Sequence, residues 1–273
     1  MFHQHRQQTP FQAFIAICEL VYHVTVRSVR STHGNAILGL LLTMSQAIIM
    51  LGAFYVMFSL LGLRSAAIRG DFLLYLMSGV FLFITHNKGL SSVLGAEGPT
   101  SAMMKHAPMN TAIAISGSAL AGLYTTILAL LTILFLYHIL WSPITILDPI
   151  PALGMLLLAW ISGCSVGLVL LALKPWAPRF VGVLATIYQR ANMIASGKMF
   201  VANALPANML AMFDWNPLFH TIDQARGFIF INYFPHNSDI WYPVKFTLIF
   251  AMLGLMGEFF TRRRASLSWS ARN

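Results

Sequence analysis

Long apolar runs separated by short polar segments dominate the pattern of this sequence. A helix needs about 20 mostly apolar residues to cross the hydrocarbon core of a bilayer. Residues 36–61 contain no charged side chain, and the run from residue 72 to 85 is followed by the polar triplet His86-Asn87-Lys88 in its last turns. The pattern predicts six transmembrane helices, at residues 36–61, 72–88, 111–140, 149–173, 178–200 and 241–260.

Residues 11–30 show a different periodicity, that of an amphipathic helix. At about 100° per residue, one face carries Gln12, Glu19, His23, Arg27 and Arg30, and the aromatic and aliphatic side chains lie away from it. This division is typical of a helix that lies in the membrane interface. The alternative is a helix packed on a soluble partner.

Composition supports a membrane protein. The chain is 58% hydrophobic and only 9% charged, whereas soluble domains carry about 25% charged residues. The net charge of +9 comes without a basic stripe interleaved with aromatics, so nucleic-acid binding is not expected. We expect an all-α membrane protein with six transmembrane helices, an N-terminal interfacial helix and re-entrant outer helices before the last span.

The charges predict the orientation, because cytoplasmic loops are enriched in Lys and Arg. With both termini inside, the outer segments hold only Arg64, Arg69 and Arg226 among the basic residues outside the spans. The inner segments hold Arg6, Arg27, Arg30, Lys88, Lys105, Lys174, Arg179, Arg262, Arg263, Arg264 and Arg272. We expect a cytoplasmic N-terminal part at residues 1–35, a permease domain at 36–261 and a basic cytoplasmic tail at 262–273.

Two connections are longer than simple turns. One is the inner stretch at 87–110. The other is the outer stretch at 201–240, which is rich in aromatics and prolines and contains apolar runs at 209–213 and 228–234. These runs are too short to span a bilayer and predict segments that dip back into the outer leaflet, covered there by protein.

Signatures of catalysis are mostly absent from the sequence. It has no G-x-x-x-x-G-K-[ST], H-E-x-x-H, G-x-S-x-G or Cys-x-x-Cys motif. The scattered histidines, among them His86, His138 and His220, predict interfacial or hydrogen-bonded side chains rather than a metal site. We expect a transporter subunit and not an enzyme, with no catalytic residue, metal or cofactor in this chain; any ATP and Mg would be used by a separate subunit.

Two cations in the fifth predicted span are unusual, because a cation near the bilayer centre costs about 2.5–3.5 kcal/mol. Arg190 and Lys198 are eight residues apart, so one continuous helix would place both on one side, with Tyr188 and Asn192 nearby. They could line a wet pathway for an anionic substrate. Alternatively, Arg190 pairs with a neighbouring helix and Lys198 snorkels outward.

Aromatic side chains in the first span could contact sugar rings along the same pathway. They are Phe54, Tyr55 and Phe58. The alternative for these three is packing or an interfacial belt. Together with Tyr188, Arg190 and Lys198 they form the predicted substrate pathway.

Three sequence blocks carry a resemblance to a known family. They are Arg27-x-x-Arg30 through Leu38-Gly39, then Gly70-Asp71-Phe72-Leu73 through Gly79, and an outer block with Ser196-Gly197, Leu205-Pro206 and Trp215-Asn216-Pro217-Leu218-x-His220-x-Ile222-Asp223-x-x-Arg226. The outer block resembles the S-G, L-P and N-P-L-x-H-x-I-E-x-x-R pattern of type-2 ABC exporter permeases for capsular polysaccharide, polysialic acid or O-antigen. This sequence departs from the pattern in having Asp223 for Glu, and in residues 190–196, where the family has an apolar, Pro- and Phe-containing approach.

The resemblance implies a homodimer bound to two copies of a cytoplasmic ATP-binding cassette subunit in the bacterial inner membrane. A coupling helix would lie at about 97–108, and Arg27, Arg30, Glu97 and Lys105 would contact the ATPase. The substrate would be a lipid-linked, anionic surface polysaccharide, and a periplasmic co-polymerase or outer-membrane channel could be further partners. An outer gate would be shaped by Ser196, Gly197, Trp215, Asn216, Pro217, His220, Asp223 and Arg226.

Other functions remain open at this stage. The same architecture could export a lipid or a drug. A membrane-embedded glycan or acyl transferase would need His220 and Asp223, at i and i+3, as its catalytic pair. The Asn216-Pro217 block could also be purely architectural, since asparagine caps helices and proline occupies their first turn.

Overall fold

The structure is a computed structural model that describes residues 10–31, 36–62, 70–96 and 110–270. Every regular element in these ranges is a helix. The helices are α1 (Pro10–Ser31), α2 (Ala36–Leu60), α3 (Phe72–Leu94), α4 (Thr111–Leu140), α5 (Pro149–Leu173), α6 (Pro178–Ala195), the 3₁₀ turn η2 (Ala202–Ala204), α7 (Ala207–Phe213), α8 (Pro217–Ile229) and α9 (Trp241–Ser270).

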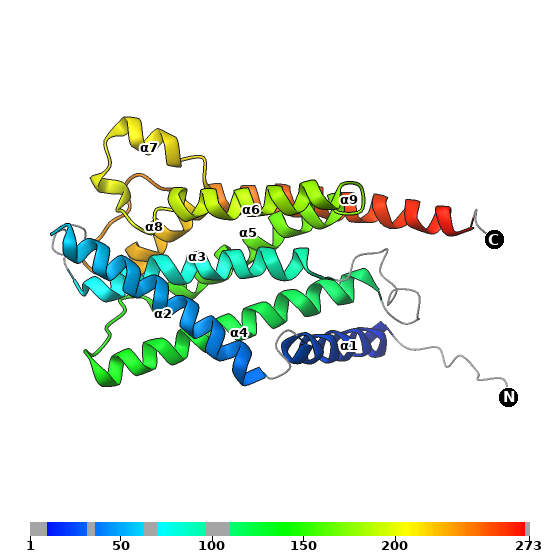
Figure 1. Cartoon of the computed structure of the whole chain (residues 1–273), viewed down its shortest axis with the longest axis horizontal. Helices are drawn as coiled ribbons and strands as arrows, with labels where there is room; N and C mark the ends of the chain where they lie inside the picture. Colours follow the sequence, from blue (N-terminus) through cyan, green and yellow to red (C-terminus); the bar gives the residue numbers. More distant parts are fainter. Residues whose placement is uncertain (1–9, 32–35, 63–69, 97–109, 271–273) are drawn as a thin grey trace.

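The six long helices α2–α6 and α9 alternate in direction along one axis (Figure 1). The start of α1 and the end of α9 lie at one end of the bundle, here called the terminus end. Helices α7 and α8 lie at the opposite end, here called the cap end.

Four helices in the described part of the chain are long and apolar enough to cross a membrane. They are α2, α4, α5 and the first part of α9, up to Arg263. Helices α3 and α6 fall outside this set; α3 ends in the polar stretch that begins at His86. The structure therefore shows a membrane-like helical bundle, with a firm match for four of the six predicted spans.

Helix boundaries agree with the sequence pattern where the chain offers capping residues. The Asp71 carboxylate accepts the backbone N–H groups of Leu73 and Leu74 at the start of α3, and Asn110 caps α4 in the same way. These side chains satisfy N–H groups that a helix start leaves without a partner. Helix α9 continues past the predicted span, to Ser270.

Helix α6 is shorter than predicted. It ends at Ala195 rather than residue 200, because Gly197 adopts the left-handed conformation, with φ +74°, which ends helices and favours glycine. A Cβ at this position would lie 2.7 Å from the Phe219 ring. The prediction that Arg190 and Lys198 share one side of a continuous helix is therefore wrong.

Helix α3 lies at the centre of the bundle and contacts α2, α4, α5, α6 and α8. Its close approach to α5 depends on glycine. A Cβ on Gly163 would lie 2.0 Å from the His86 carbonyl oxygen, and one on Gly89 would lie 2.7 Å from that of Trp160. Small residues allow membrane helices to pack backbone against backbone, and this contact fixes the rotation of α3.

Helix α1 packs along α4, with Val24 against Gly117. The predicted amphipathic helix is confirmed in extent. Its aromatic side chains Phe11, Phe14 and Tyr22 lie exposed on the outside of the bundle, as expected for a helix that offers an apolar face to a membrane interface.

Candidate functional site

A polar cleft between α2, α3 and α6 is the most distinctive concave feature. It has a volume of about 470 Å³ and two cationic side chains, Lys88 and Arg190. Uncharged polar side chains, Thr43, Gln46, Asn87, Ser91, Thr186 and Gln189, make up much of the remaining lining. The described lining residues include no Asp or Glu, so the cleft suits an anion.

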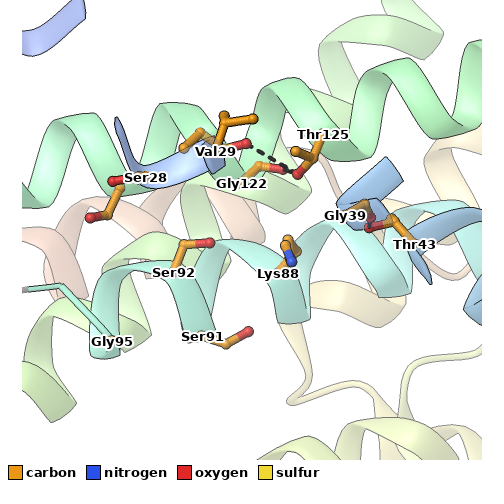
Figure 2. A pocket seen from close by; sticks show the side chains of 12 residues that line it. Ser28, Val29, Gly39, Thr43, Lys88, Ser91, Ser92, Gly95, Gly122 and Thr125 are labelled. Atoms are coloured by element: carbon orange, nitrogen blue, oxygen red, sulfur yellow. Dashed lines mark hydrogen bonds between the residues drawn. The ribbon is translucent and has the colours of Figure 1, made fainter. Parts of the chain in front are cut away.

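A second pocket of about 380 Å³ lies between α1, α2, α3 and α4. Figure 2 shows Lys88 among hydroxyl groups from the surrounding helices, including Ser28 of α1, Ser92 of α3 and Thr125 of α4. Thr43, Lys88 and Ser91 line both pockets. We treat the two as one feature, the cationic cleft, with Lys88 at the junction.

The position of Lys88 follows from the packing of α3. Gly89, the next residue, faces α5 at close range. Since neighbouring residues on a helix point about 100° apart, Lys88 lies to the side of the contact with α5, where it lines the cleft. The sequence signal for this site was the polar triplet His86-Asn87-Lys88 near the end of an apolar run, which fits either a snorkelling helix end or a water-lined stretch.

The His86 imidazole links α3 to α5 and α6. It is fully buried, and its Nδ1 lies 3.1 Å from the Ala159 carbonyl oxygen and 3.0 Å from Ser162 Oγ. Since a carbonyl only accepts, Nδ1 carries the proton, and Nε2 accepts a hydrogen bond from the Tyr188 hydroxyl at 3.1 Å. Tyr188 thus fixes the rotation of α6, and Arg190 lies two residues further on, in the cleft.

The residues of the predicted substrate pathway therefore occupy different environments. Arg190 is exposed in the cleft, whereas Tyr188 faces inward to His86. Phe54 and Phe58 are buried in the core, where Phe58 and Tyr55 pack against Phe72. Lys198 is 1% exposed, so the alternative that it snorkels outward is wrong.

Asn216 begins the network at the cap end. Its side-chain oxygen accepts the Leu218 N–H at the start of α8, with Pro217 in the first helical position. Its Nδ2 donates to Asn192 Oδ1 at 2.8 Å and to the Ala195 carbonyl at 3.0 Å. The capping role of Asn216 and the first-turn position of Pro217 are confirmed: the Asn216 side chain caps α8 and joins it to the end of α6.

Arg226 holds the segment that follows α6. It is buried, and its guanidinium donates to the carbonyls of Gly197, Lys198 and Phe200 at 2.7–2.9 Å. The same group lies over the Tyr75 ring of α3, 4.3 Å from the centroid. Ser196, also buried, lies in the turn that Arg226 secures. This arrangement explains why an arginine stands at the end of the sequence block.

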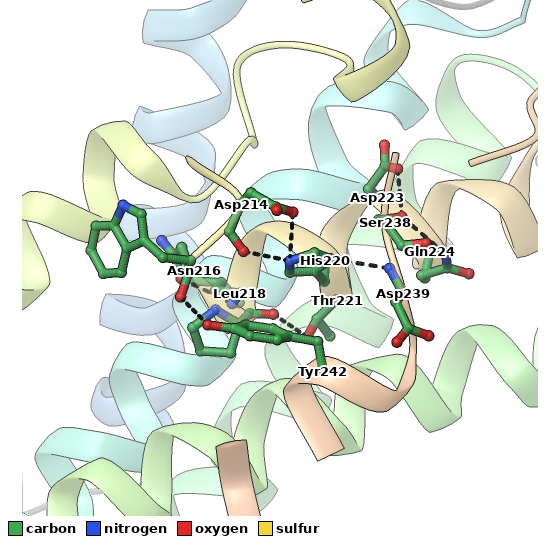
Figure 3. A network of polar contacts seen from close by, with 12 residues as sticks. Asp214, Asn216, Leu218, His220, Thr221, Asp223, Gln224, Ser238, Asp239 and Tyr242 are labelled. Carbon is green, nitrogen blue, oxygen red and sulfur yellow. Dashed lines mark hydrogen bonds and ion pairs between the residues drawn. The ribbon is translucent and has the colours of Figure 1, made fainter. Parts of the chain in front are cut away.

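His220 and Asp223 bond to different partners (Figure 3). His220 Nδ1 accepts the Asp239 N–H, so Nε2 carries a proton and donates to the Asp214 carbonyl at 2.7 Å. Asp223 accepts the hydroxyls of Tyr233 and Ser238. Burial, reinforced by the nearby Asp223 charge, raises the pKa of the Tyr233 phenol.

Trp215 is the exposed member of this group. Its indole donates to the Met212 carbonyl, and its own carbonyl accepts the Tyr242 hydroxyl. The predicted outer-gate residues are thus brought together at the cap end, mostly as a buried network between α6, α8 and the start of α9. The predicted hydrogen-bonding of His86, His138 and His220 is confirmed.

Only two of the four predicted ATPase contacts, Arg27 and Arg30, fall within the described residues. Arg27 and Arg30 are exposed on α1. Glu97, Lys105 and the expected coupling helix at 97–108 lie outside the described residues. No group of His, Cys, Asp and Glu suited to a metal ion occurs among the residues that the structure describes.

Comparison with known protein families gives no matching family model, and comparison with curated proteins gives no match.

Proposed function

We propose that this chain is the membrane-spanning permease subunit of an ATP-driven exporter that moves an anionic, lipid-linked polysaccharide across a bacterial inner membrane. The observation that carries the proposal is the cationic cleft inside an apolar helical bundle. A charged group in such a bundle is costly unless it faces water or a ligand, and Lys88 and Arg190 share one cleft whose described lining holds no acidic residue.

The six-span layout, with both termini cytoplasmic, belongs to this proposal. Helices α3 and α6 cross together with the four apolar helices, and their polar faces line the cleft rather than meeting lipid. The terminus end carries Lys174, Arg179, Arg262 and Arg263, and this charge supports a cytoplasmic position for it under the positive-inside rule. The cleft is lined by the second half of α3, the half nearer this end, so a lipid-linked substrate made in the cytoplasm would enter it from that side.

The energy would come from a partner. The sequence has no phosphate-binding loop, and its blocks resemble those of polysaccharide exporter permeases. Two copies of the chain would assemble with two copies of an ATP-binding cassette subunit, held by α1 and the 97–108 segment. Nucleotide-driven movement of that subunit would change the width of the cleft.

The test is surface polysaccharide in cells that depend on this chain. Arg190→Ala should lower surface glycan at least tenfold at an unchanged level of the protein in the membrane, and Arg190→Lys should restore part of it. The matched control is Arg179→Ala, an exposed cation near the start of the same helix. Normal glycan in Arg190→Ala cells would remove the proposed role of the cleft.

The rival cargo is a lipid or a drug. If this rival holds, the purified chain and ATPase in vesicles should export a fluorescent lipid or dye, and Arg190→Ala should change that export little. Surface glycan in cells should then be unaffected. A transferase has no support from the cap end, because His220 and Asp223 bond to separate partners there.

A further inference from the structure

Lys198 is a buried cation without a hydrogen-bond partner. Its side chain is 1% exposed, and its Nζ has no acceptor among the described residues. A buried polar group is normally paired, because losing its contacts with water is otherwise uncompensated. An unpaired ammonium in a native structure therefore calls for a reason.

Two aromatic rings take the place of an acceptor. Lys198 Nζ lies 3.4 Å from the centroid of the Phe83 ring of α3 and 5.6 Å from that of Phe54 of α2. The negative face of an aromatic ring attracts a cation, but it competes poorly with a carboxylate or a phosphate. The ammonium is held, yet it can still be drawn away by an anion.

The backbone around Lys198 is built to direct this side chain inward. Its carbonyl accepts a hydrogen bond from Arg226 at 2.9 Å. A Cβ on Gly79 of α3 would lie 2.8 Å from Lys198 Cα, so the segment is packed directly on that helix. The positive φ of Gly197 turns the chain at this point.

Phe83 connects Lys198 to the cationic cleft. The Phe83 side chain lines the cleft, and it also carries the ammonium on its ring. Along α3, Lys88, Phe83 and Gly79 follow one another toward the cap end at about 1.5 Å per residue. An anion that leaves Lys88 and Arg190 for the cap end meets Phe83, with Lys198 next to it.

We propose that Phe83, Phe54 and Lys198 form a closed anion gate at the cap end of the cleft, in which an arriving carboxylate or phosphate draws the ammonium off the rings and opens the passage. This inference rests on the proposed function only in that an anion moves along the cleft. It does not depend on the nature of the cargo or on the ATPase.

The first test uses stability. In Lys198→Met the side chain stays unbranched, is one atom shorter and loses the unpaired amine, so the thermal unfolding temperature of the purified protein in detergent should rise by a few degrees. The matched control is Lys245→Met, which removes an exposed lysine of α9 and should leave the temperature unchanged. An unchanged or lower temperature in Lys198→Met would mean that the lysine only supports packing, and would overturn the gate.

The second test uses phosphate and acetate efflux from proteoliposomes of the purified chain, without ATPase or glycan. Phe83→Ala, or Phe83→Leu if the alanine variant does not fold, should raise the efflux of one or both anions about tenfold over the unsubstituted chain. The acetate and phosphate arms show which oxyanion passes. Adding Lys198→Met should return the efflux toward the original level, and adding Lys245→Met should not.

Failures of the two proposals are distinguishable. No efflux through the Phe83 variants, or equal efflux with and without Lys198, overturns the gate even if the cells export glycan normally. Gated efflux in a chain that moves no glycan overturns the exporter and leaves the gate in place.

Discussion

Polar side chains are buried and hydrogen-bonded at the cap end, whereas in the cationic cleft they face open space. At the cap end, Asn216, His220, Asp223 and Arg226 are almost fully buried, and each has several hydrogen-bond partners at short range. In the cleft, Lys88 and Arg190 face open space. Hydrogen-bonded polar networks make a structure rigid, whereas charged groups that face open space are accessible to a ligand.

The two regions also differ in whether a sequence motif marks them. The block from Asn216 to Arg226 is the most motif-like part of the chain, and the structure gives most of it an architectural task. The cleft residues have no motif. We therefore expect substitutions at the cap end to act on the free energy of unfolding and substitutions in the cleft to act on transport.

The largest effect on stability is expected for Arg226→Met. It leaves the buried carbonyls of Gly197, Lys198 and Phe200 without their donor, at a cost of about 3–5 kcal/mol. Thermal unfolding in detergent and yield of monodisperse protein measure the loss. A stable Arg226→Met protein that fails to export would break the comparison, since Arg226 would then act in transport.

Gly163→Ala should cause the second-largest loss of stability, because the added Cβ would lie 2.0 Å from the His86 carbonyl oxygen. Overpacking of this kind costs about 1–3 kcal/mol or more, and the forced rotation of α3 should also disturb the cleft. Gly182→Ala of α6 is the control, because it meets nothing within 4 Å and should stabilise the helix by up to about 1 kcal/mol. Equal unfolding temperatures for the two variants would contradict the close α3–α5 packing.

Tyr188→Phe tests the link between the two regions. It removes the hydroxyl that bonds His86 Nε2, at a cost of about 1 kcal/mol. Because that bond fixes the rotation of α6, the accessibility of a cysteine placed at Arg190 to a water-soluble thiol reagent should also change. The reference is the same cysteine substitution with Tyr188 intact; identical labelling rates would show that α6 is positioned by other contacts.

Lys88→Met should have the smallest effect on stability, within about 0.5 kcal/mol, because a half-buried cation with no acid among the described residues of its cleft contributes little. Export should nevertheless fall at least tenfold if the cleft holds the anion. Unfolding temperature and surface glycan, measured on the same variant, sharpen the comparison with Arg226→Met. Loss of stability without loss of export would reverse the roles assigned to the two regions.

Much of the helical layout could be predicted from the sequence. Apolar runs bounded by Asp71, Asn110 and Pro149 indicate where α3, α4 and α5 begin, since these residues act locally. The capping role of Asn216 was also within reach for the same reason. The extent of α1 followed from its periodicity.

The rest depends on how the helices are rotated about their own axes. The turn at Gly197 separates Lys198 from α6, and it is held by a distant arginine that periodicity does not reveal. The link between His86 and Tyr188 joins residues 102 positions apart. The packed backbone contacts of α3 with α5 at Gly89 and Gly163 show why Lys88 belongs to the cleft.

Helix α1 is part of the cleft that it borders. Ser28 and Val29 line the pocket beside Lys88, one turn from the Val24 contact with Gly117 and next to the exposed Arg27. A protein that binds α1 from the aqueous side would therefore also hold one wall of the pocket around Lys88. By thermodynamic reciprocity, any anion that prefers one position of α1 must alter, by the same factor, how tightly that protein is held.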